Sequence, residues 1–277
     1  MADLLTEWSN WQEGLGSHIL EADRKVLNSE RSKKNTVTNT KWSDVYQAND
    51  FAAPGDKRLH LGLLPHPYCG DLKNAEIYIL MLNPGYGPWD YFGEFEVPEF
   101  RKAVLSNLKQ DFSSKTLPFF MIDPQFSWYG GFAWWHGKFA RVIEKLAEIK
   151  GITYAEARNE LGTKVASIEL LPYHSTSFND ANHWIRDLPS VNLAREFVKD
   201  YVIPRVKDGK AIAIVTRKAN IWDLPEHSGV VRYSSQEARA AHLSPNSPGG
   251  KAILNRLTQG DFDKKKAHNY SKKELYV

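Results

Sequence analysis

The sequence predicts an α/β fold in which helices cover both faces of a parallel sheet, giving three α/β/α layers. Four apolar runs of strand length alternate with segments of helical periodicity, and this alternation is typical of parallel sheets. A strand that is buried on both faces is apolar at nearly every position. The four predicted strands are residues 75–82, 165–171, 211–216 and 229–233.

The predicted helices lie before, between and after these strands, where apolar residues recur every three or four positions. Thr153 and Glu156 form a capping box, so a helix should begin there, and Gly162 should end it. Pro204 and Gly260 should end the next two helices. The apolar stripes are Leu4, Leu5, Trp8, Trp11, Leu15 and Ile19; Phe139, Val142, Ile143, Leu146 and Ile149; Leu193, Ala194, Phe197, Val198 and Tyr201; and Ala252, Ile253, Leu254 and Leu257.

Length and charge divide the chain into three expected parts. A chain of 277 residues fits one α/β domain with terminal extensions. We expect an N-terminal helical extension over residues 1–60, a domain over 61–260 and a basic tail over 261–277. From Lys251 onward seven basic residues face three acidic ones, a local charge of +4, although the whole chain carries only +3. This basic end is either a solvated terminus or an edge that contacts phosphates.

Several classes of protein are excluded by what the sequence lacks. No secretory signal and no apolar run of about 20 residues is visible, so we expect a cytoplasmic protein without a membrane partner. The single Cys69 excludes a disulfide framework, an iron–sulfur cluster and a thiolate zinc site. The nine His residues lack helical metal spacing, and no glycine-rich nucleotide motif or serine-hydrolase elbow occurs. We therefore expect no metal and no cofactor.

Ligands of such sheets bind outside the carboxyl ends of the strands, so the residues that follow each strand are the candidate site. The first strand leads into Asn83, Pro84 and Gly85, which alone would be an ordinary turn. The second strand contains Glu169. The fourth strand is followed, after a short helical segment, by the loop of residues 242–250.

Taken together, these motifs resemble the uracil-DNA glycosylase superfamily. The family has an Asn-Pro-Gly variant after its first strand, a polar residue near the end of the second, and a late His-x-Ser-Pro loop, here His242 to Pro245. Leu243 departs from the Pro that the late loop often has. The resemblance covers roughly residues 65–257 and leaves the N-terminal part unexplained. It implies a four-stranded parallel sheet and a monomeric enzyme that flips a base out of double-stranded DNA and hydrolyses its N-glycosidic bond, leaving an abasic site.

The resemblance also implies a role for each matching residue. Asn83 would position the water that attacks C1′ of the deoxyribose. His242 would donate a hydrogen bond to O2 of the departing base, where negative charge develops. The implied base pocket comprises Pro84, Gly85 and Tyr86, and the implied DNA contacts are Ser244, Pro245, Asn246, Ser247, Gly249, Gly250 and Lys251, with the two glycine amides at a helix start suited to a phosphate.

Glu169 is the departure that suggests the substrate. The family has an Asn at this place to read uracil, whereas an ionised carboxylate only accepts hydrogen bonds and suits the N4–H₂ group of cytosine. In a buried pocket a raised pKa would also let Glu169 protonate N3 and assist the departure of cytosine. The alternative is a Glu that points to solvent or is bound to a backbone amide, because a shift of one residue in the strand register turns the side chain to the other face.

A glycosylase that reads cytosine must spare the normal base, so a substituent at C5 is the natural second criterion. Aromatic residues are dense between residues 89 and 136 and suit either a large shaped pocket or ordinary core packing. We therefore expect a bulky 5-modified cytosine, such as the glucosylated hydroxymethylcytosine of phage DNA, and a role in antiphage defence. Asp90 and Glu94 are secondary candidates for binding sugar hydroxyls or aiding the water. The alternatives are a uracil or mismatch glycosylase of DNA repair, a non-catalytic sensor of modified DNA, and an unrelated α/β domain.

Overall fold

A five-stranded sheet forms the centre of the computed structural model, which describes residues 3–13, 18–51, 53, 56–113, 116–178, 183–234 and 242–258. The strand order is β3–β5–β4–β6–β7, and the last four pair in parallel. The four predicted strands are confirmed as this parallel part. The strands are β3 (Tyr68–Cys69), β4 (Ile77–Met81), β5 (Val165–Glu169), β6 (Ile212–Val215) and β7 (Val230–Arg232).

The edge strand β3 was not predicted, so the prediction of a purely parallel four-stranded sheet is wrong at this edge. β3 pairs antiparallel with β5, with Tyr68 opposite Ile168 and Cys69 opposite Ser167. A strand of two residues, within a stretch rich in Pro and Gly, is too short to show the alternation of apolar and polar residues by which a strand is recognised. Gly70 follows with φ of 99°, and a Cβ there would lie 2.4 Å from the carbonyl oxygen of Val165. Only glycine fits this approach.

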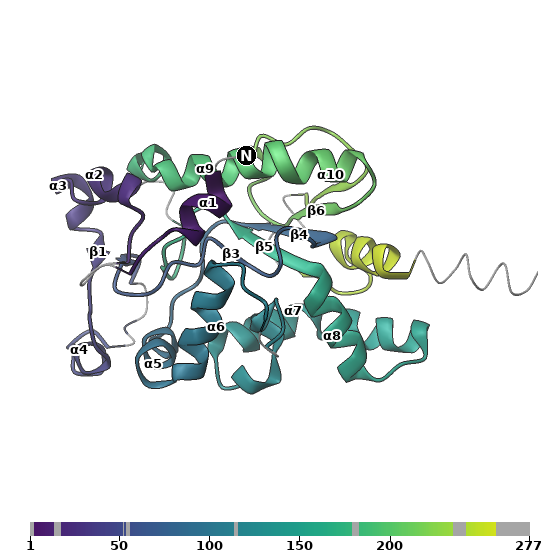
Figure 1. Ribbon diagram of the computed structural model, residues 1–277, viewed down its shortest axis with the longest axis horizontal. Helices are drawn as coiled ribbons and strands as arrows, with labels where there is room; N and C mark the ends of the chain where they lie inside the picture. The colour runs from purple at the N-terminus through teal and green to yellow at the C-terminus, as the bar shows by residue number, and fades with distance from the viewer. Residues whose placement is uncertain are drawn as a thin grey trace, which may run out of the picture.

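Helices cover both faces of the sheet, so the three-layer α/β/α arrangement is present (Figure 1). One face carries α1, α9 and α10, and the other carries α6, α7 and α8. Residues 248–258 form a further helix. The bounds are α1 (Asp3–Ser9), α5 (Pro88–Glu96), α6 (Pro98–Leu108), η2 (Phe120–Ile122), η3 (Pro124–Phe126), α7 (Gly130–Lys150), α8 (Tyr154–Lys164), η4 (His183–Asp187), α9 (Pro189–Phe197), α10 (Ile203–Lys207) and η6 (Ala219–Ile221).

The capping box at the start of α8 is confirmed, but two predicted helix ends are wrong. Thr153 Oγ1 accepts from the Glu156 N–H at 3.2 Å, and Glu156 Oε2 accepts from the Thr153 N–H at 2.8 Å. Gly162 lies inside α8, where it packs against Leu117. Pro204 does not end a helix but lies in the first turn of α10, where a missing N–H is tolerated. The helix continues through this point because a π-helical turn, η5 (Val198–Val202), connects α9 to α10.

The N-terminal segment packs onto the same core as the sheet. The first helix ends at Ser9, earlier than its apolar stripe suggested, and Leu15 lies outside the described residues. Leu4 and Trp8 are buried in one cluster with β4 and β5. The remaining elements are η1 (Glu21–Asp23), α2 (Arg24–Leu27), α3 (Glu30–Lys33), α4 (Trp42–Tyr46) and a two-stranded parallel sheet of β1 (Thr36–Val37) and β2 (Leu59–His60).

Two further expectations concern the chain's ends and membranes. Gly260 and the basic tail of residues 261–277 lie outside the described residues. Among the helices that are described, none combines the length and apolar character needed to cross a membrane.

Candidate active site

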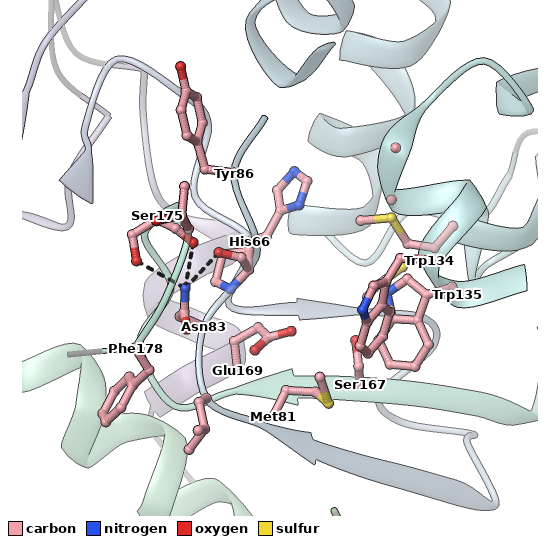
Figure 2. Close-up of a pocket in the computed structure, with 18 of the residues that line it drawn as sticks. His66, Met81, Asn83, Tyr86, Trp134, Trp135, Ser167, Glu169, Ser175 and Phe178 are labelled. Carbon is pink, nitrogen blue, oxygen red and sulfur yellow. Dashed lines mark hydrogen bonds between the residues drawn. The ribbon is translucent and has the colours of Figure 1, made fainter. Parts of the chain in front are cut away.

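A cavity of about 540 Å³ lies at the carboxyl ends of β4, β5 and β6. Each of these three strands is followed by residues that line it, at 82–86, 175–178 and 216–218. Figure 2 shows Asn83 and Tyr86 from the first of these segments and Ser175 and Phe178 from the second. This is where parallel α/β sheets bind ligands, and the volume lies in the usual range of about 300–1,000 Å³ for small-molecule sites. The cavity is therefore the candidate active site.

Asn83 is held in the cavity wall by its amide nitrogen. Nδ2 donates to the carbonyl oxygen of Pro84 at 2.9 Å, to that of Ser175 at 3.0 Å and to Ser175 Oγ at 3.1 Å. Because the nitrogen is fully engaged, the orientation of the amide is fixed. No described residue donates to Oδ1, which leaves that oxygen to accept from a water or a ligand.

Glu169 ends β5 and faces the cavity, so the alternative of a solvent-facing Glu is wrong. Its side chain is buried and Oε2 has no partner among the described residues. Burial raises the pKa of Glu169 well above its usual range, because no nearby group compensates the loss of hydration. Figure 2 shows the carboxyl group between Asn83 and the pair Trp134 and Trp135. A buried carboxyl with an unpartnered oxygen in a cavity is a group that can bind the polar edge of a ligand.

The remaining residues of the first loop have mainly structural contacts. Pro84 and Gly85 line the cavity, and the Gly85 carbonyl accepts from His174 Nδ1 at 2.7 Å. The Tyr86 ring stacks on His60 with centroids 3.5 Å apart and points away from Asn83 in Figure 2. Burial raises the pKa of Tyr86 to about 12. One face of the Tyr86 ring is thus occupied by protein.

His242 is not brought to Asn83 and Glu169 in the way the sequence predicted. It is exposed and is not among the residues that line the cavity, and its carbonyl oxygen accepts from the hydroxyl of Tyr233. Leu243, at the place where the related loop often has Pro, is buried in the core and anchors the loop. The structure therefore gives the predicted role of His242 no support.

The predicted phosphate site at Gly249 and Gly250 is wrong, because both amides are used within the loop. The Gly249 N–H donates to the Tyr233 hydroxyl at 3.1 Å, and the Gly250 N–H donates to Ser247 Oγ at 3.0 Å. Ser247 Oγ in turn donates to the Ser244 carbonyl at 2.8 Å. Pro245 is half-buried, whereas Asn246 and Lys251 are exposed to solvent.

The loop after β6 is the part of the site that the sequence analysis missed. Thr216, Arg217 and Lys218 line the cavity, and they directly follow the third predicted strand. The rule that drew attention to Asn83, namely that ligands bind where strands end, would have found them.

Basic and aromatic side chains meet at this part of the cavity. The Lys218 ammonium lies 5.7 Å from the centre of the Phe178 ring, and the Lys138 ammonium lies 5.2 Å from that of Trp134. Burial, with a smaller contribution from Arg217, lowers the pKa of Lys138. Phe178 and Trp134 both line the cavity. A positive rim with exposed rings is suited to phosphates and bases of a nucleic acid.

The aromatic segment supplies both the core and the cavity wall. Tyr91, Phe100, Phe119 and Phe126 are buried core residues, as the packing alternative predicted. Trp89 and Trp134 are 46% and 44% exposed and line the cavity.

The structure does not support the suggestion that Asp90 and Glu94 bind sugar hydroxyls or aid the attacking water. Asp90 lines it, but Oδ2 accepts from the Gly87 N–H at 2.7 Å and Oδ1 from the Tyr129 hydroxyl at 2.5 Å. Glu94 is buried and accepts from the Leu64 N–H at 2.8 Å. Asp90 thus fixes the start of α5.

One group of side chains has the composition of a metal site, although the sequence predicted none. His66, Glu94 and His174 each bring one possible ligand atom to within 4.8 Å of the others. They are far apart in the sequence, so no short metal-binding motif could have predicted them.

Comparisons with known proteins add nothing to this geometry, because no protein-family model, curated protein or solved structure matches the chain.

Proposed function

We propose that the protein is a DNA glycosylase with a uracil-DNA-glycosylase-like fold. It would flip a bulky 5-modified cytosine into the cavity and hydrolyse its N-glycosidic bond without a cofactor, leaving an abasic site. The observation that carries the proposal is the meeting of Asn83 and Glu169, from the ends of two adjacent strands, in one cavity.

Asn83 supports the hydrolytic step. An amide is too weak a base to deprotonate water, but the sugar develops oxocarbenium character and needs only a well-placed nucleophile. The three hydrogen bonds of Nδ2 hold Oδ1 as the acceptor for that water. Asn83 thus acts by positioning.

Glu169 supports recognition of the base. When neutral, its hydroxyl donates to N3 of cytosine and its other oxygen accepts from N4–H₂, and transfer of the proton to N3 makes cytosine a better leaving group. When ionised, it only accepts, so it binds the N4–H₂ group and repels O4 of uracil. The raised pKa of Glu169 favours the neutral form.

The shape of the cavity supports a substituent at C5. A volume of about 540 Å³ is typical of sites for ligands larger than a bare pyrimidine. The exposed parts of Trp89 and Trp134 suit contact with a sugar ring. Lys138, Arg217 and Lys218 supply the positive charge that a DNA backbone requires, and the protein would act on duplex DNA as a monomer.

The experiment is a cleavage assay on duplex oligonucleotides that carry one cytosine, hydroxymethylcytosine, glucosylated hydroxymethylcytosine or uracil. Alkali cuts the strand wherever the enzyme has left an abasic site. We expect cleavage at the glucosylated base, lost in Asn83→Ala and retained in Asn74→Ala, an exposed Asn whose side chain bonds only to Asp71. Tight binding without cleavage would identify a sensor and refute the enzyme, and absence of salt-dependent binding would refute the whole proposal.

A second candidate, excision of uracil, is favoured by the neutral state of Glu169. A protonated carboxyl donates to O4 and accepts from N3–H, as an amide does, and therefore also matches uracil. Cleavage of the uracil duplex alone, in the same assay, would assign this activity and overturn the cytosine proposal.

A further inference from the structure

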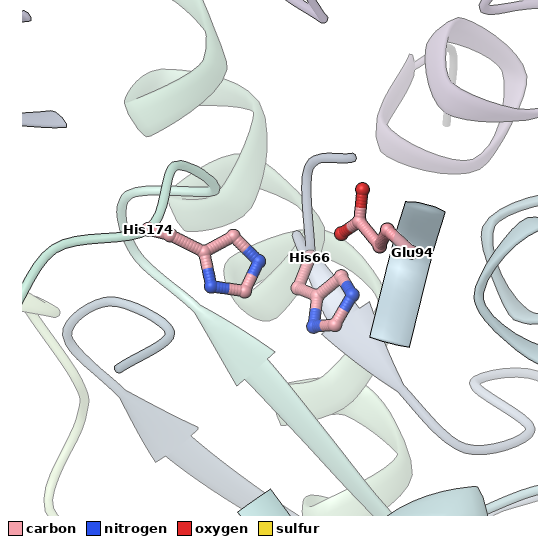
Figure 3. A group of neighbouring side chains, drawn as sticks. All are labelled: His66, Glu94 and His174. Atoms are coloured by element: carbon pink, nitrogen blue, oxygen red, sulfur yellow. The ribbon is translucent and has the colours of Figure 1, made fainter. Parts of the chain in front are cut away.

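Three buried side chains meet between α5, the segment before β3 and the loop after β5. They are Glu94 of α5, His66 and His174, with exposures of 2%, 6% and 1% (Figure 3). One possible ligand atom of each lies within 4.8 Å of the other two. No other group of three such residues with this spacing occurs among the residues that the structure describes.

Each of the three side chains carries one buried polar atom without a partner among the described residues. These atoms are His66 Nε2, Glu94 Oε1 and His174 Nε2. A buried polar atom that lacks a partner has lost its hydration without compensation, so native proteins seldom keep several together. Three such atoms on three neighbouring side chains could all be satisfied by one bound ligand.

Two of the three side chains, His174 and Glu94, are held in place through their other polar atom. His174 Nδ1 donates to the Gly85 carbonyl at 2.7 Å, so the proton is on Nδ1 and the Nε2 lone pair is available. Glu94 Oε2 accepts from the Leu64 N–H at 2.8 Å and lies 3.9 Å from Arg101 Nη1, which leaves Oε1 without a partner among the described residues. Hydrogen bonds of this kind hold ligating histidines and carboxylates in metal sites.

We propose that His66, Glu94 and His174 bind a divalent transition-metal ion of the zinc type, with water as its fourth ligand. Two imidazole nitrogens and one carboxylate oxygen form a donor set that zinc prefers. Tetrahedral bonds of about 2.0–2.1 Å place the donor atoms about 3.4 Å apart, so binding draws the side chains together. The hard cations calcium and magnesium favour oxygen ligands and do not fit.

The ion would join three separate segments of the chain. Through the bond from His174 to Gly85 it would also stabilise the loop that carries Asn83. His66 lines the cavity, so the site lies beside the candidate active site. The proposal does not depend on the glycosylase activity, because it concerns binding alone.

The test is a titration of the full-length, chelator-treated protein with Co²⁺ and then Zn²⁺. We expect one Co²⁺ per chain, with the strong visible absorption of a tetrahedral ion, displacement by an equivalent of Zn²⁺, and a higher thermal unfolding midpoint with Zn²⁺. Absence of one-to-one binding at micromolar metal would overturn the proposal.

Two variants and one spectrum locate the ion. Glu94→Gln keeps an acceptor for the Leu64 N–H but loses the anionic ligand, so Co²⁺ affinity should fall at least tenfold, because even loss of a supporting hydrogen bond costs about 10–100-fold. The control variant His18→Gln replaces a buried His outside the proposed site and should bind Co²⁺ with the affinity of the wild type. Equal affinity in wild type and Glu94→Gln would overturn the site. If Glu94→Gln does not fold, X-ray absorption of the zinc-loaded wild type decides: two imidazoles and no sulfur support the site, and a sulfur ligand refutes it.

Discussion

Replacement of Glu169 by Gln should make the protein more resistant to unfolding, by an amount that grows with pH. In the unfolded chain the carboxyl loses its proton near the usual pKa of 4.5, whereas burial raises the pKa of the folded side chain well above this value. At pH values between these two pKa values, the folded state holds up to one more proton than the unfolded state. The free energy of unfolding of the wild type therefore falls as pH rises, by about 1.4 kcal/mol per pH unit from this group.

Gln does not titrate, so the difference between Glu169→Gln and wild type isolates this contribution. Between pH 5 and pH 7 the difference should grow by up to about 2.7 kcal/mol in favour of the variant, and any change in packing adds the same offset at every pH. The assay is urea unfolding followed by tryptophan fluorescence across pH 5–9. A difference that does not change with pH would refute the claim that Glu169 is buried without a partner.

The control is Glu76→Gln, whose difference from wild type should stay nearly constant between pH 5 and pH 9 and change only in more acidic solution. Burial raises the pKa of Glu76, but ion pairs with Lys164 at 2.5 Å and Arg256 at 2.9 Å outweigh it and hold the pKa below its usual range. The stabilisation by Glu76 is present above pH 4.5 and lost as pH falls through the lowered pKa. Glu76→Gln should therefore be less stable than wild type at neutral pH, and the loss should shrink in acid.

Three further outcomes are expected. His242→Ala should lower base excision less than tenfold, because the side chain is exposed and outside the cavity; a loss of a hundredfold or more would restore its role as a donor. Arg217→Gln should reduce the slope of log affinity for DNA against log salt concentration by about one unit, measured by fluorescence anisotropy, and an unchanged slope would show that Arg217 contacts no phosphate. Trp8→Ala should lower the free energy of unfolding by about 3–5 kcal/mol, because Trp8 is fully buried in the main core. A loss below 1 kcal/mol in urea would show that the N-terminal segment packs independently of the sheet.

The elements that could be predicted are those whose packing imposes a pattern on consecutive residues. β4, β5 and β6 are buried on both faces, so nearly every position is apolar, and α8 begins at a capping box. β3 was missed because a two-residue edge strand has no pattern, and its pairing with β5 is long-range. Pro204 was misread because a π-helical turn, Val198–Val202, precedes it and lets the helix continue, and the sequence pattern did not indicate such a turn.

The same distinction holds for the candidate site. Asn83 and Glu169 could be predicted because each lies at the end of a recognisable strand. In a parallel sheet the residues at the carboxyl ends of neighbouring strands lie close together. His66, Glu94 and His174 lie in a loop, a helix and another loop, so only the tertiary structure reveals their proximity. The failure at Gly249 has the same origin, because the Tyr233 hydroxyl that occupies its amide comes from a separate segment. Ser247 directly precedes the helix of residues 248–258 and accepts from the Gly250 N–H as an ordinary N-cap residue, so the sequence could have indicated that this amide is used.

The peptide bond between Asn83 and Pro84 has a consequence for the chemical durability of the protein. Asparagine slowly deamidates when the backbone nitrogen of the next residue attacks its side-chain carbonyl and closes a succinimide ring. Proline has no N–H on that nitrogen, so this route is closed at Pro84. Conversion of Asn83 to Asp would replace an amide donor that serves three acceptors with a negative charge that repels them. Pro84 thus protects Asn83, the asparagine of the candidate active site, from deamidation by this route.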